Sequence, residues 1–355
     1  MEIALITLGS LMIVATVLPL SRSEVWWIRI FDFPRLQIVV ITFIVLVVYL
    51  WLRGAGGVGG TLFAAALALC LLWQGSMLFP YMRLSRVQVQ RSHSPEPQSS
   101  ISLLFANVLM SNRDAARFRA IIREADPDII LTVETDAWWE AQLREFERTH
   151  PFAVRQVQDN TYGMLLYSKL ELLDPQIKFL VQDDIPSIHA QIKLPSGMEV
   201  GLHCLPPRPP FPTEDEQSTE RDAELLIVGR EIKGKETPVI VLGDLNDVAW
   251  SHTNYHFQDI SGLLDPRIGR GFYNTFHAKY PFIRFPLDHF FHSNHFRLIG
   301  FRRLSYFGSD HFPVLIALSY EPDAQHQQEE LTTDESQQAE AQKKIEKAGE
   351  SASHV

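Results

Sequence analysis

The sequence predicts an α/β domain of two packed sheets with helices outside, preceded by three transmembrane helices. Two observations lead to this prediction. Residues 1–100 contain three long apolar runs without a charged side chain, and from residue 101 strand and helix patterns alternate before the chain becomes rich in strands. At 355 residues the chain has room for both parts, since its segment 101–320 is long enough to bury a large core.

The three apolar runs cover residues 3–20, 36–52 and 58–79 and are 18, 17 and 22 residues long. A bilayer core needs about 20 apolar residues, with a range of about 17–25, so each run can span it. The first run has only Glu2 ahead of it and lacks the basic segment of a cleaved signal peptide, so we expect it to be retained. Buried helices of a soluble protein are the less favoured alternative, because the three runs follow one another with short links.

Basic residues predict the orientation of these spans. With three spans, the loop 21–35 and everything after the third span lie on one side of the membrane. That side carries Arg22, Arg29, Arg35, Arg83, Arg86 and Arg91, whereas the opposite side carries Arg53. The positive-inside rule therefore predicts that the large domain is cytoplasmic. A periplasmic domain stays open as the alternative, because long translocated domains follow the rule poorly.

Composition divides the chain into four parts: an anchor at 1–80, a linker at 81–100, a main domain at 101–320 and a tail at 321–355. As a flexible coil, the 20-residue linker would span roughly 25 Å, which keeps the domain close to the lipid headgroups. The tail is acidic, rich in Gln, Glu, Ser and Ala, and has few large apolar side chains, so it is predicted to be disordered.

Within the main domain, short apolar runs predict strands and amphipathic patterns predict helices. Strands are expected at 101–108, 128–133, 162–168, 188–194, 199–204, 239–242, 290–291 and 313–319. Helices are expected at 113–124 and 137–148, and from Thr213 to about residue 232.

The charge of the chain limits its partners. The formal net charge is −10, and the main domain is itself acidic, which argues against a general nucleic-acid binder with a basic footprint. The two cysteines exclude a disulfide framework.

Polar side chains of ligand or base type stand at six predicted strand ends. They are Asn107, Glu134, His203, Asp244 with Asn246, Asp288, and Asp310 with His311. Each alone also fits a surface carboxylate, a turn-forming asparagine or a structural histidine. Phosphoester cleavage needs oxygen ligands for a divalent cation, a base, and a partner that fixes the tautomer of that base. The whole set therefore predicts metal-assisted attack on a phosphate.

Three of these segments resemble known motifs. Gly243-Asp244-Leu245-Asn246, Leu287-Asp288-His289-Phe290-Phe291 and Ser309-Asp310-His311-Phe312-Pro313 are similar in content, order and spacing to the C-terminal motifs of the endonuclease/exonuclease/phosphatase superfamily. The resemblance covers about residues 101–320. It implies a four-layer α/β sandwich with two mixed sheets, and a phosphoesterase that uses Mg²⁺ or Mn²⁺.

The resemblance also implies a role for each matching residue. Glu134 matches the metal-binding glutamate, Asp310 a second metal contact, and Asn107 the asparagine that supports the metal site. His311 matches the base and Asp288 the carboxylate that orients it.

The remaining matches concern the phosphate. Asp244 and Asn246 match the pair that positions water and phosphate, and His203 matches a second histidine that acts on the phosphate or the leaving group. Tyr162 lies in the segment that lines the site. Arg208 and Arg284 are the basic residues nearest the motifs and could hold a phosphate bidentately, although both also fit surface arginines.

Two features separate the chain from the DNA-repair members of that superfamily. Leu109 stands where those members carry an aspartate. Trp250-Ser251 and Asn274-Thr275-Phe276, together with the apolar runs, resemble the membrane-anchored bacterial branch, some of whose members are linked to lipid phosphates. The resemblance implies a bacterial inner membrane as the location.

The leading hypothesis is a membrane-anchored, metal-dependent phosphoesterase that acts on a lipid or small-molecule phosphate mono- or diester. A membrane-bound endonuclease or exonuclease acting on DNA or RNA is the second hypothesis, disfavoured by the acidic domain and by Leu109. The third is a non-catalytic membrane adaptor built on a degenerate domain.

Overall fold

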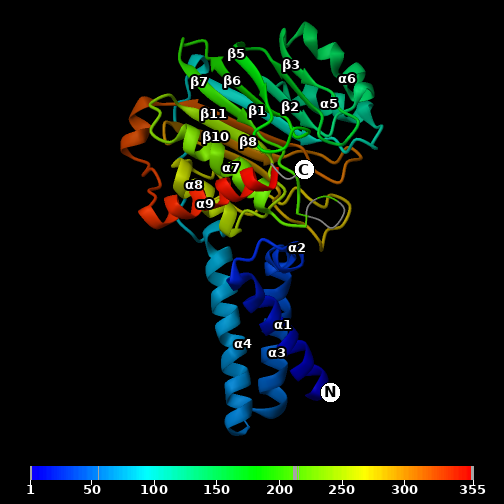
Figure 1. Cartoon of the computed structure of the whole chain (residues 1–355), viewed down its shortest axis with the longest axis vertical. Helices are drawn as coiled ribbons and strands as arrows, with labels where there is room; N and C mark the ends of the chain where they lie inside the picture. The colour runs from blue at the N-terminus through cyan, green and yellow to red at the C-terminus, as the bar shows by residue number, and fades with distance from the viewer. Residues whose placement is uncertain (1, 55, 211–213, 215, 353–355) are drawn as a thin grey trace.

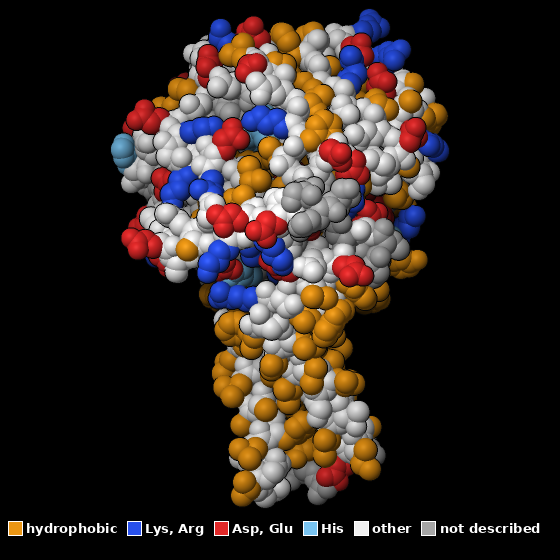
Figure 2. Space-filling view, viewed as in Figure 1, with side chains coloured by type: hydrophobic (Ala, Val, Ile, Leu, Met, Phe, Trp, Pro, Cys, Tyr) orange, Lys and Arg blue, Asp and Glu red, His pale blue; other side chains and the backbone are white. Residues whose placement is uncertain are grey.

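The computed structural model describes residues 2–54, 56–210, 214 and 216–352. A head of two sheets and surrounding helices sits on a stalk of three long helices (Figure 1). The stalk consists of α1 (Glu2–Val17), α3 (Arg35–Arg53) and α4 (Gly57–Leu78). All three are long and apolar enough to cross a membrane, and hydrophobic side chains cover the stalk up to the head (Figure 2). The three predicted apolar helices are confirmed.

The connection between α1 and α3 joins the stalk to the head. It contains the short turns η1 (Leu18–Ser21), α2 (Trp26–Arg29) and η2 (Ile30–Asp32). The indole Nε1 of Trp250 donates to the Asp32 carbonyl at 2.7 Å, and Arg29 Nη2 lies 2.6 Å from Asp247 Oδ2. We call residues 22–34 the anchor loop. It lies on the same side of the stalk as the head, as the three-span topology requires.

The prediction that residues 81–100 form a flexible coil is wrong, because this segment packs along the head. Val89 is buried in the main core. The backbone next to Val89 pairs with an edge strand of the head. Leu298 N donates to Gln90 O at 2.9 Å, and Ser92 N donates to Leu298 O at 3.0 Å. Burial of Val89 and pairing of the edge outweigh the flexibility that the Ser/Pro-rich composition suggested.

The head contains two mixed sheets, as predicted. The first has the order β10-β11-β1-β2-β4-β3, formed by Phe296–Arg303, Val314–Tyr320, Ser100–Asn107, Ile129–Val133, Met164–Ser168 and Phe152–Gln156. The second has the order β5-β6-β7-β8-β9, formed by Glu171–Lys178, Ser187–Lys193, Glu199–Cys204, Val239–Asp244 and Asp288–His292. β1 pairs with β2 in parallel, as does β7 with β8, and the other pairs are antiparallel.

Helices cover the outer face of each sheet, which completes the predicted four layers. α5 (Ala115–Ala125) and α6 (Ala137–Leu143) pack on the first sheet through Phe118 and Trp139. α7 (Thr219–Ile232) and α8 (His252–Ser261) pack on the second sheet. α7 begins at Thr219, later than the sequence predicts; Thr213 lies outside the described residues.

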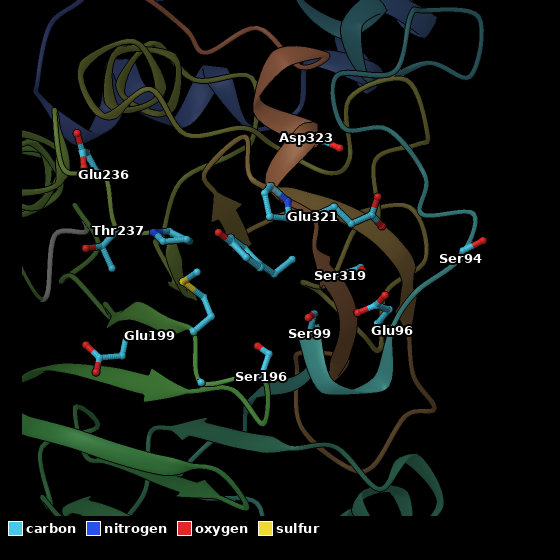
Figure 3. A pocket seen from close by; sticks show the side chains of 15 residues that line it. Ser94, Glu96, Ser99, Ser196, Glu199, Glu236, Thr237, Ser319, Glu321 and Asp323 are labelled. Carbon is cyan, nitrogen blue, oxygen red and sulfur yellow. The ribbon is translucent and has the colours of Figure 1, made fainter.

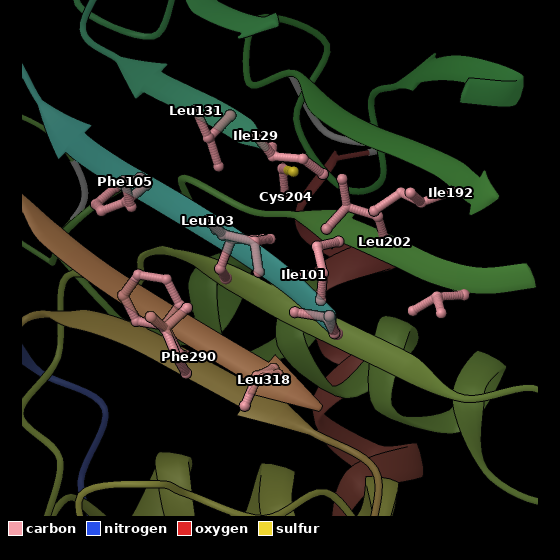
Figure 4. Packing of buried hydrophobic residues seen from close by; sticks show 14 of the residues in the cluster. Ile101, Leu103, Phe105, Ile129, Leu131, Ile192, Leu202, Cys204, Phe290 and Leu318 are labelled. Carbon is pink, nitrogen blue, oxygen red and sulfur yellow. The ribbon is translucent and has the colours of Figure 1, made fainter. Parts of the chain in front are cut away.

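The main core lies between the two sheets (Figure 4). Ile101, Leu103 and Phe105 of β1 face inward and meet Leu202 and Cys204 of β7 in one buried cluster. Because side chains alternate along a strand, the residues between them face the outer helices. This packing brings the ends of the two sheets close together.

The tail predicted to be disordered is ordered in its described part. α9 (Glu335–Ala352) packs along α7, and Lys344 Nζ lies 2.8 Å from Asp222 Oδ2. The physical reason is a narrow stripe: Ala341, Ile345 and Ala348 recur at helical spacing and face the head. The average composition of the tail is polar and does not reveal these three residues.

Candidate active site

The polar residues at the strand ends meet at one edge of the two sheets. Asn107 ends β1, Glu134 follows β2 and Asp244 ends β8. The Asn107 Nδ2 group donates to Glu134 Oε1 at 2.7 Å and to Asp244 Oδ2 at 3.0 Å, which links the ends of the two sheets. Asn107 Oδ1 accepts from Leu109 N at 2.9 Å. Asn107 therefore orients the two carboxylates, and Leu109 N fixes its side-chain oxygen.

His311 lies beside this group and is held by Asp288. Its Nδ1 atom is 3.1 Å from both carboxylate oxygens of Asp288, and its Nε2 atom is 3.6 Å from Asp244 Oδ2. The Phe276 ring packs on the imidazole with centroids 5.1 Å apart. Ser309 Oγ accepts from His311 N at 3.0 Å, which fixes the backbone. With Nδ1 donating to Asp288, Nε2 is left to face the cavity.

Burial and charge shift the titration of these groups. Burial opposes a charge on His311, but the carboxylates of Asp288, Asp244 and Asp310 outweigh it and raise its pKa to about 10. Burial also raises the pKa of Asp244 to about 7, despite the attraction of His311. Burial raises the pKa of Glu134 as well, despite its hydrogen bond from Asn107. The site thus contains more buried negative charge than its own side chains neutralise.

A divalent cation fits this donor set. Glu134 and Asp310 line the same cavity, and each offers carboxylate oxygens, the hard ligands that Mg²⁺ and Mn²⁺ prefer. Burial raises the pKa of Glu134 and so opposes its charge, and a cation bound to its oxygens would stabilise the carboxylate. Asp244, Asp288 and His311 also lie close enough together to contact one ion.

Asn246 adds an amide to the rim of the site. Its backbone N–H donates to Asp244 Oδ1 at 3.1 Å, and its side-chain Nδ2 donates to the Pro207 carbonyl at 2.9 Å. Both Asp244 and Asn246 line the cavity beside His311. The structure thus brings together seven of the predicted residues: Asn107, Glu134, Asp244, Asn246, Asp288, Asp310 and His311.

His203 is not part of this group, which corrects its predicted place on the phosphate. Leu202 and Cys204 face the core between the sheets, so His203 faces the outer layer. Its Nδ1 atom lies 2.7 Å from Nδ1 of His189. Burial, helped by the neighbouring imidazole, lowers the pKa of His203 to about 3, and burial lowers that of His189 to about 4.

Tyr162 lies near the site, and Arg208 packs on Tyr162 without lining the cavity itself. Tyr162 lines a small cavity of about 150 Å³ with Asn107 and Glu134, and its hydroxyl donates to Glu214 Oε2 at 2.9 Å. The Arg208 guanidinium lies 5.3 Å from the centre of the Tyr162 ring and is paired with Asp184.

Arg284 supports the backbone beside the site. Its Nη2 group donates to the Ala278 carbonyl at 2.9 Å, and its guanidinium stacks 5.0 Å from the Phe312 ring centre. Ala278 N in turn donates to Asp310 O at 2.6 Å. In this structure Arg284 holds the segment that positions Asp310, and it does not line the cavity next to His311.

The site has an apolar wall that the sequence does not reveal. A cavity of about 500 Å³ adjoins the carboxylates and His311 and is also lined by Trp26, Ile30 and Phe33 of the anchor loop. The aromatic content of the loop is a visible signal, but its contact with residues more than 200 positions away is not encoded in any local pattern.

A hollow of about 990 Å³ lies at the other ends of the strands, where β7 and β8 begin. Figure 3 shows its lining side chains. Its described lining residues include five acidic side chains and no Lys or Arg. They are Glu96, Glu199, Glu236, Glu321 and Asp323. Because this hollow repels anions, it is a poor site for a phosphate despite its size.

Comparisons with known proteins identify the family of the chain. The family model described as Endonuclease/Exonuclease/phosphatase family matches residues 104–311, which is more than half of the chain. A search of curated proteins finds no match. Enzymes of the matching family generally depend on a divalent metal.

Solved structures share the fold of the head. Humanized TDP2 of D. rerio is 18% identical with a TM-score of 0.51, covering 62% of this chain and 99% of that one. An endonuclease/exonuclease/phosphatase from Beutenbergia cavernae is 16% identical with a TM-score of 0.52, covering 63% of this chain and 72% of that one. The human Nocturnin catalytic domain is 16% identical with a TM-score of 0.50, covering 68% and 99%.

The matched region contains the strand ends that carry the clustered carboxylates and His311. Members of the matching family hydrolyse phosphoester bonds. The chain therefore belongs to the endonuclease/exonuclease/phosphatase family and is a hydrolase of phosphoester bonds.

Proposed function

We propose that this protein is a membrane-anchored, metal-dependent phosphoesterase whose substrate is a lipid or small-molecule phosphate mono- or diester. One observation carries the proposal: the cavity beside His311 and Glu134 is shared with Trp26 and Phe33, which belong to the loop between two apolar helices. A site in this position meets molecules held at the membrane surface. The acidic head adds support, since it disfavours long polyanions.

The proposed reaction assigns work to each residue of the site. His311 Nε2 accepts the proton of the attacking water, while Asp288 fixes Nδ1 and stabilises the charged ring. Asp244 and Asn246 orient water and phosphate. A divalent cation held by Glu134 and Asp310 would neutralise phosphate oxygens and the leaving group. It would also offset the carboxylates that raise the pKa of His311, and so favour the neutral imidazole that a base requires.

A membrane-bound nuclease is the second candidate, because D. rerio TDP2, solved with a single strand DNA product, shares the fold with a TM-score of 0.51. The deciding experiment uses the full chain in detergent with Mg²⁺. Phosphate release from a polyprenyl or inositol phosphate is measured beside nicking of supercoiled plasmid, with His311→Ala as the inactive control. We expect phosphate release that His311→Ala lacks. Nicking without release from any lipid phosphate would favour the nuclease.

We further propose that the protein resides in a bacterial inner membrane with its head in the cytoplasm. The support is the excess of arginines on the head side of the spans. A reporter fused after residue 352 tests the orientation. An alkaline phosphatase fusion that is active would place the head in the periplasm. A fusion to a reporter that fluoresces only in the cytoplasm would support the proposal if it is fluorescent.

A further inference from the structure

We propose that the apolar cavity between the anchor loop and the active site binds the hydrocarbon chain of a lipid phosphate that enters from the bilayer. This inference rests on the proposed phosphoesterase function and adds the substrate class and its route. Its basis is a cavity that is polar at one end and apolar at the other, opening where the stalk meets the head.

The polar end of the cavity is the candidate active site itself. Glu134, Asp310 and His311 all line the cavity of about 500 Å³. The other end is lined by Ile30 and Phe33 of the anchor loop, which connects two apolar stalk helices. An amphiphile with a phosphate head and an apolar chain has the same polarity along its length.

The opposite wall is a hairpin-like segment at residues 276–287. Phe276 and Phe285 pair through their backbones, and Phe285 packs edge-on against Phe33 of the anchor loop with ring centroids 5.7 Å apart. Leu287 continues this wall toward the active site. The anchor loop and this segment, which are distant in sequence, therefore face each other across the cavity.

The tip of this segment is apolar and lies next to the stalk. Tyr280, Phe282 and Ile283 are 57%, 86% and 54% exposed. Gln37, in the first turn of α3, donates through Nε2 to the Phe282 carbonyl at 2.8 Å, so the tip lies where a candidate span begins. Large exposed apolar side chains at this level are typical of segments that enter the membrane interface.

The charges of the cavity favour a hydrocarbon occupant over a nucleotide chain. Among the described lining residues Arg29 is the one Lys or Arg, and it is engaged by Asp247 at 2.6 Å and by Thr253 at 3.2 Å. A polynucleotide needs several phosphate-binding cations along its path. The wall opposite the carboxylates instead offers apolar surface, and each buried methylene contributes roughly a fourfold gain in binding.

The test compares butyl phosphate with dodecyl phosphate, both below their micelle concentrations, using the full chain in detergent with Mg²⁺. We expect kcat/KM to be at least roughly tenfold higher for dodecyl phosphate, because the longer chain fills the cavity. Equal values would overturn the inference while leaving the phosphoesterase function intact. Cleavage of neither ester, with plasmid nicking observed, would overturn both.

Variants locate the effect. Ile30→Glu and Ile283→Glu introduce a charge into the cavity at positions that are 45% and 54% exposed, so folding should tolerate them. Phe179→Glu is the matched control, since Phe179 is 44% exposed on the head and does not line the cavity. We expect the two cavity variants to abolish the preference for dodecyl phosphate and the control to keep it. A preference that survives both cavity variants would overturn the assignment.

A binding measurement checks the same point without turnover. Dodecyl phosphate should raise the unfolding temperature of the wild-type chain without metal more than butyl phosphate does. Ile283→Glu should remove that difference and Phe179→Glu should retain it. Equal shifts for the two phosphates in the wild-type chain would contradict a chain-binding cavity.

Discussion

His311 and His203 are two buried histidines of the same head, and their surroundings differ in charge. His311 meets the carboxylates of Asp288 and Asp244, which come from other strands. His203 meets the imidazole of His189. The first environment favours the imidazolium and the second the neutral ring, so the pKa of His311 is raised to about 10 and that of His203 lowered to about 3. Whether a buried histidine at a strand end can be protonated therefore depends on the carboxylates that other strands place beside it.

Removal of the metal should have the largest effect on activity. It should affect the surroundings of His311 and leave those of His203 unchanged. Chelation with EDTA should reduce phosphate release by roughly a thousandfold or more, and Mg²⁺ or Mn²⁺ should restore it, because the uncompensated carboxylates around His311 need a cation. Mg²⁺ should also raise the unfolding temperature of the wild-type chain and of His203→Ala, but not that of Glu134→Gln. Full activity in EDTA would show that no metal is needed.

Substitution of the two histidines tests the comparison directly. His311→Ala should lower kcat by roughly 10²–10⁴-fold, as expected for loss of a general base. His203→Ala, the matched control, should leave kcat within about threefold, since His203 faces away from the site. A large loss in His203→Ala with intact folding by circular dichroism would return this residue to the catalytic group.

Asp288→Asn should have a smaller effect that sharpens the contrast. The amide cannot stabilise the charged ring, so we expect kcat to fall by roughly 10²-fold and the pKa of His311 to fall. An NMR titration of the histidine ring signals measures both pKa values in one sample. The pKa of His203 should stay unchanged, and an equal shift of both would indicate a general rearrangement.

The pH dependence of stability should show the smallest effect. Burial depresses the folded pKa values of His189 and His203 to about 4 and 3, below their ordinary value of 6.5. The unfolded chain therefore binds more protons than the folded chain as the pH falls below 6.5, and stability should decrease through that window. Thermal unfolding of wild type and His203→Gln between pH 7 and 4 measures it. The variant should show the shallower decrease, and a steeper one would contradict the assignment.

Much of the fold was predictable because its signals are local. Uncharged runs gave the three stalk helices, and apolar runs gave the central strands, with β1 observed at Ser100–Asn107. The clustering of Asp244, Asp288 and His311 followed from polar groups at strand ends. The predicted strand 128–133 also overlaps β2, which is observed at Ile129–Val133.

The structural features that were predicted wrongly or missed are of two kinds. They concern which face of a strand a side chain occupies, and contacts between segments distant in the sequence. Alternation with Leu202 and Cys204 could have placed His203 on the outer face, but a strand-end position alone does not show which side a residue faces. The anchor loop reaches the active site through contacts between distant parts of the chain, such as Arg29 with Asp247, and no local pattern encodes them. The tail helix depends on a few small apolar residues, including Ala341, that composition averages away.

The last helix has a consequence for how the protein is made. Lys344 of α9 pairs with Asp222, and Lys347 pairs with Glu24 of the anchor loop, 323 positions away in the sequence. The anchor loop and α9 therefore hold each other in place. During synthesis, the anchor loop waits for its final contacts until residue 347 has left the ribosome, so a chain stopped before α9 would expose the surfaces of α7 and α8 to aggregation.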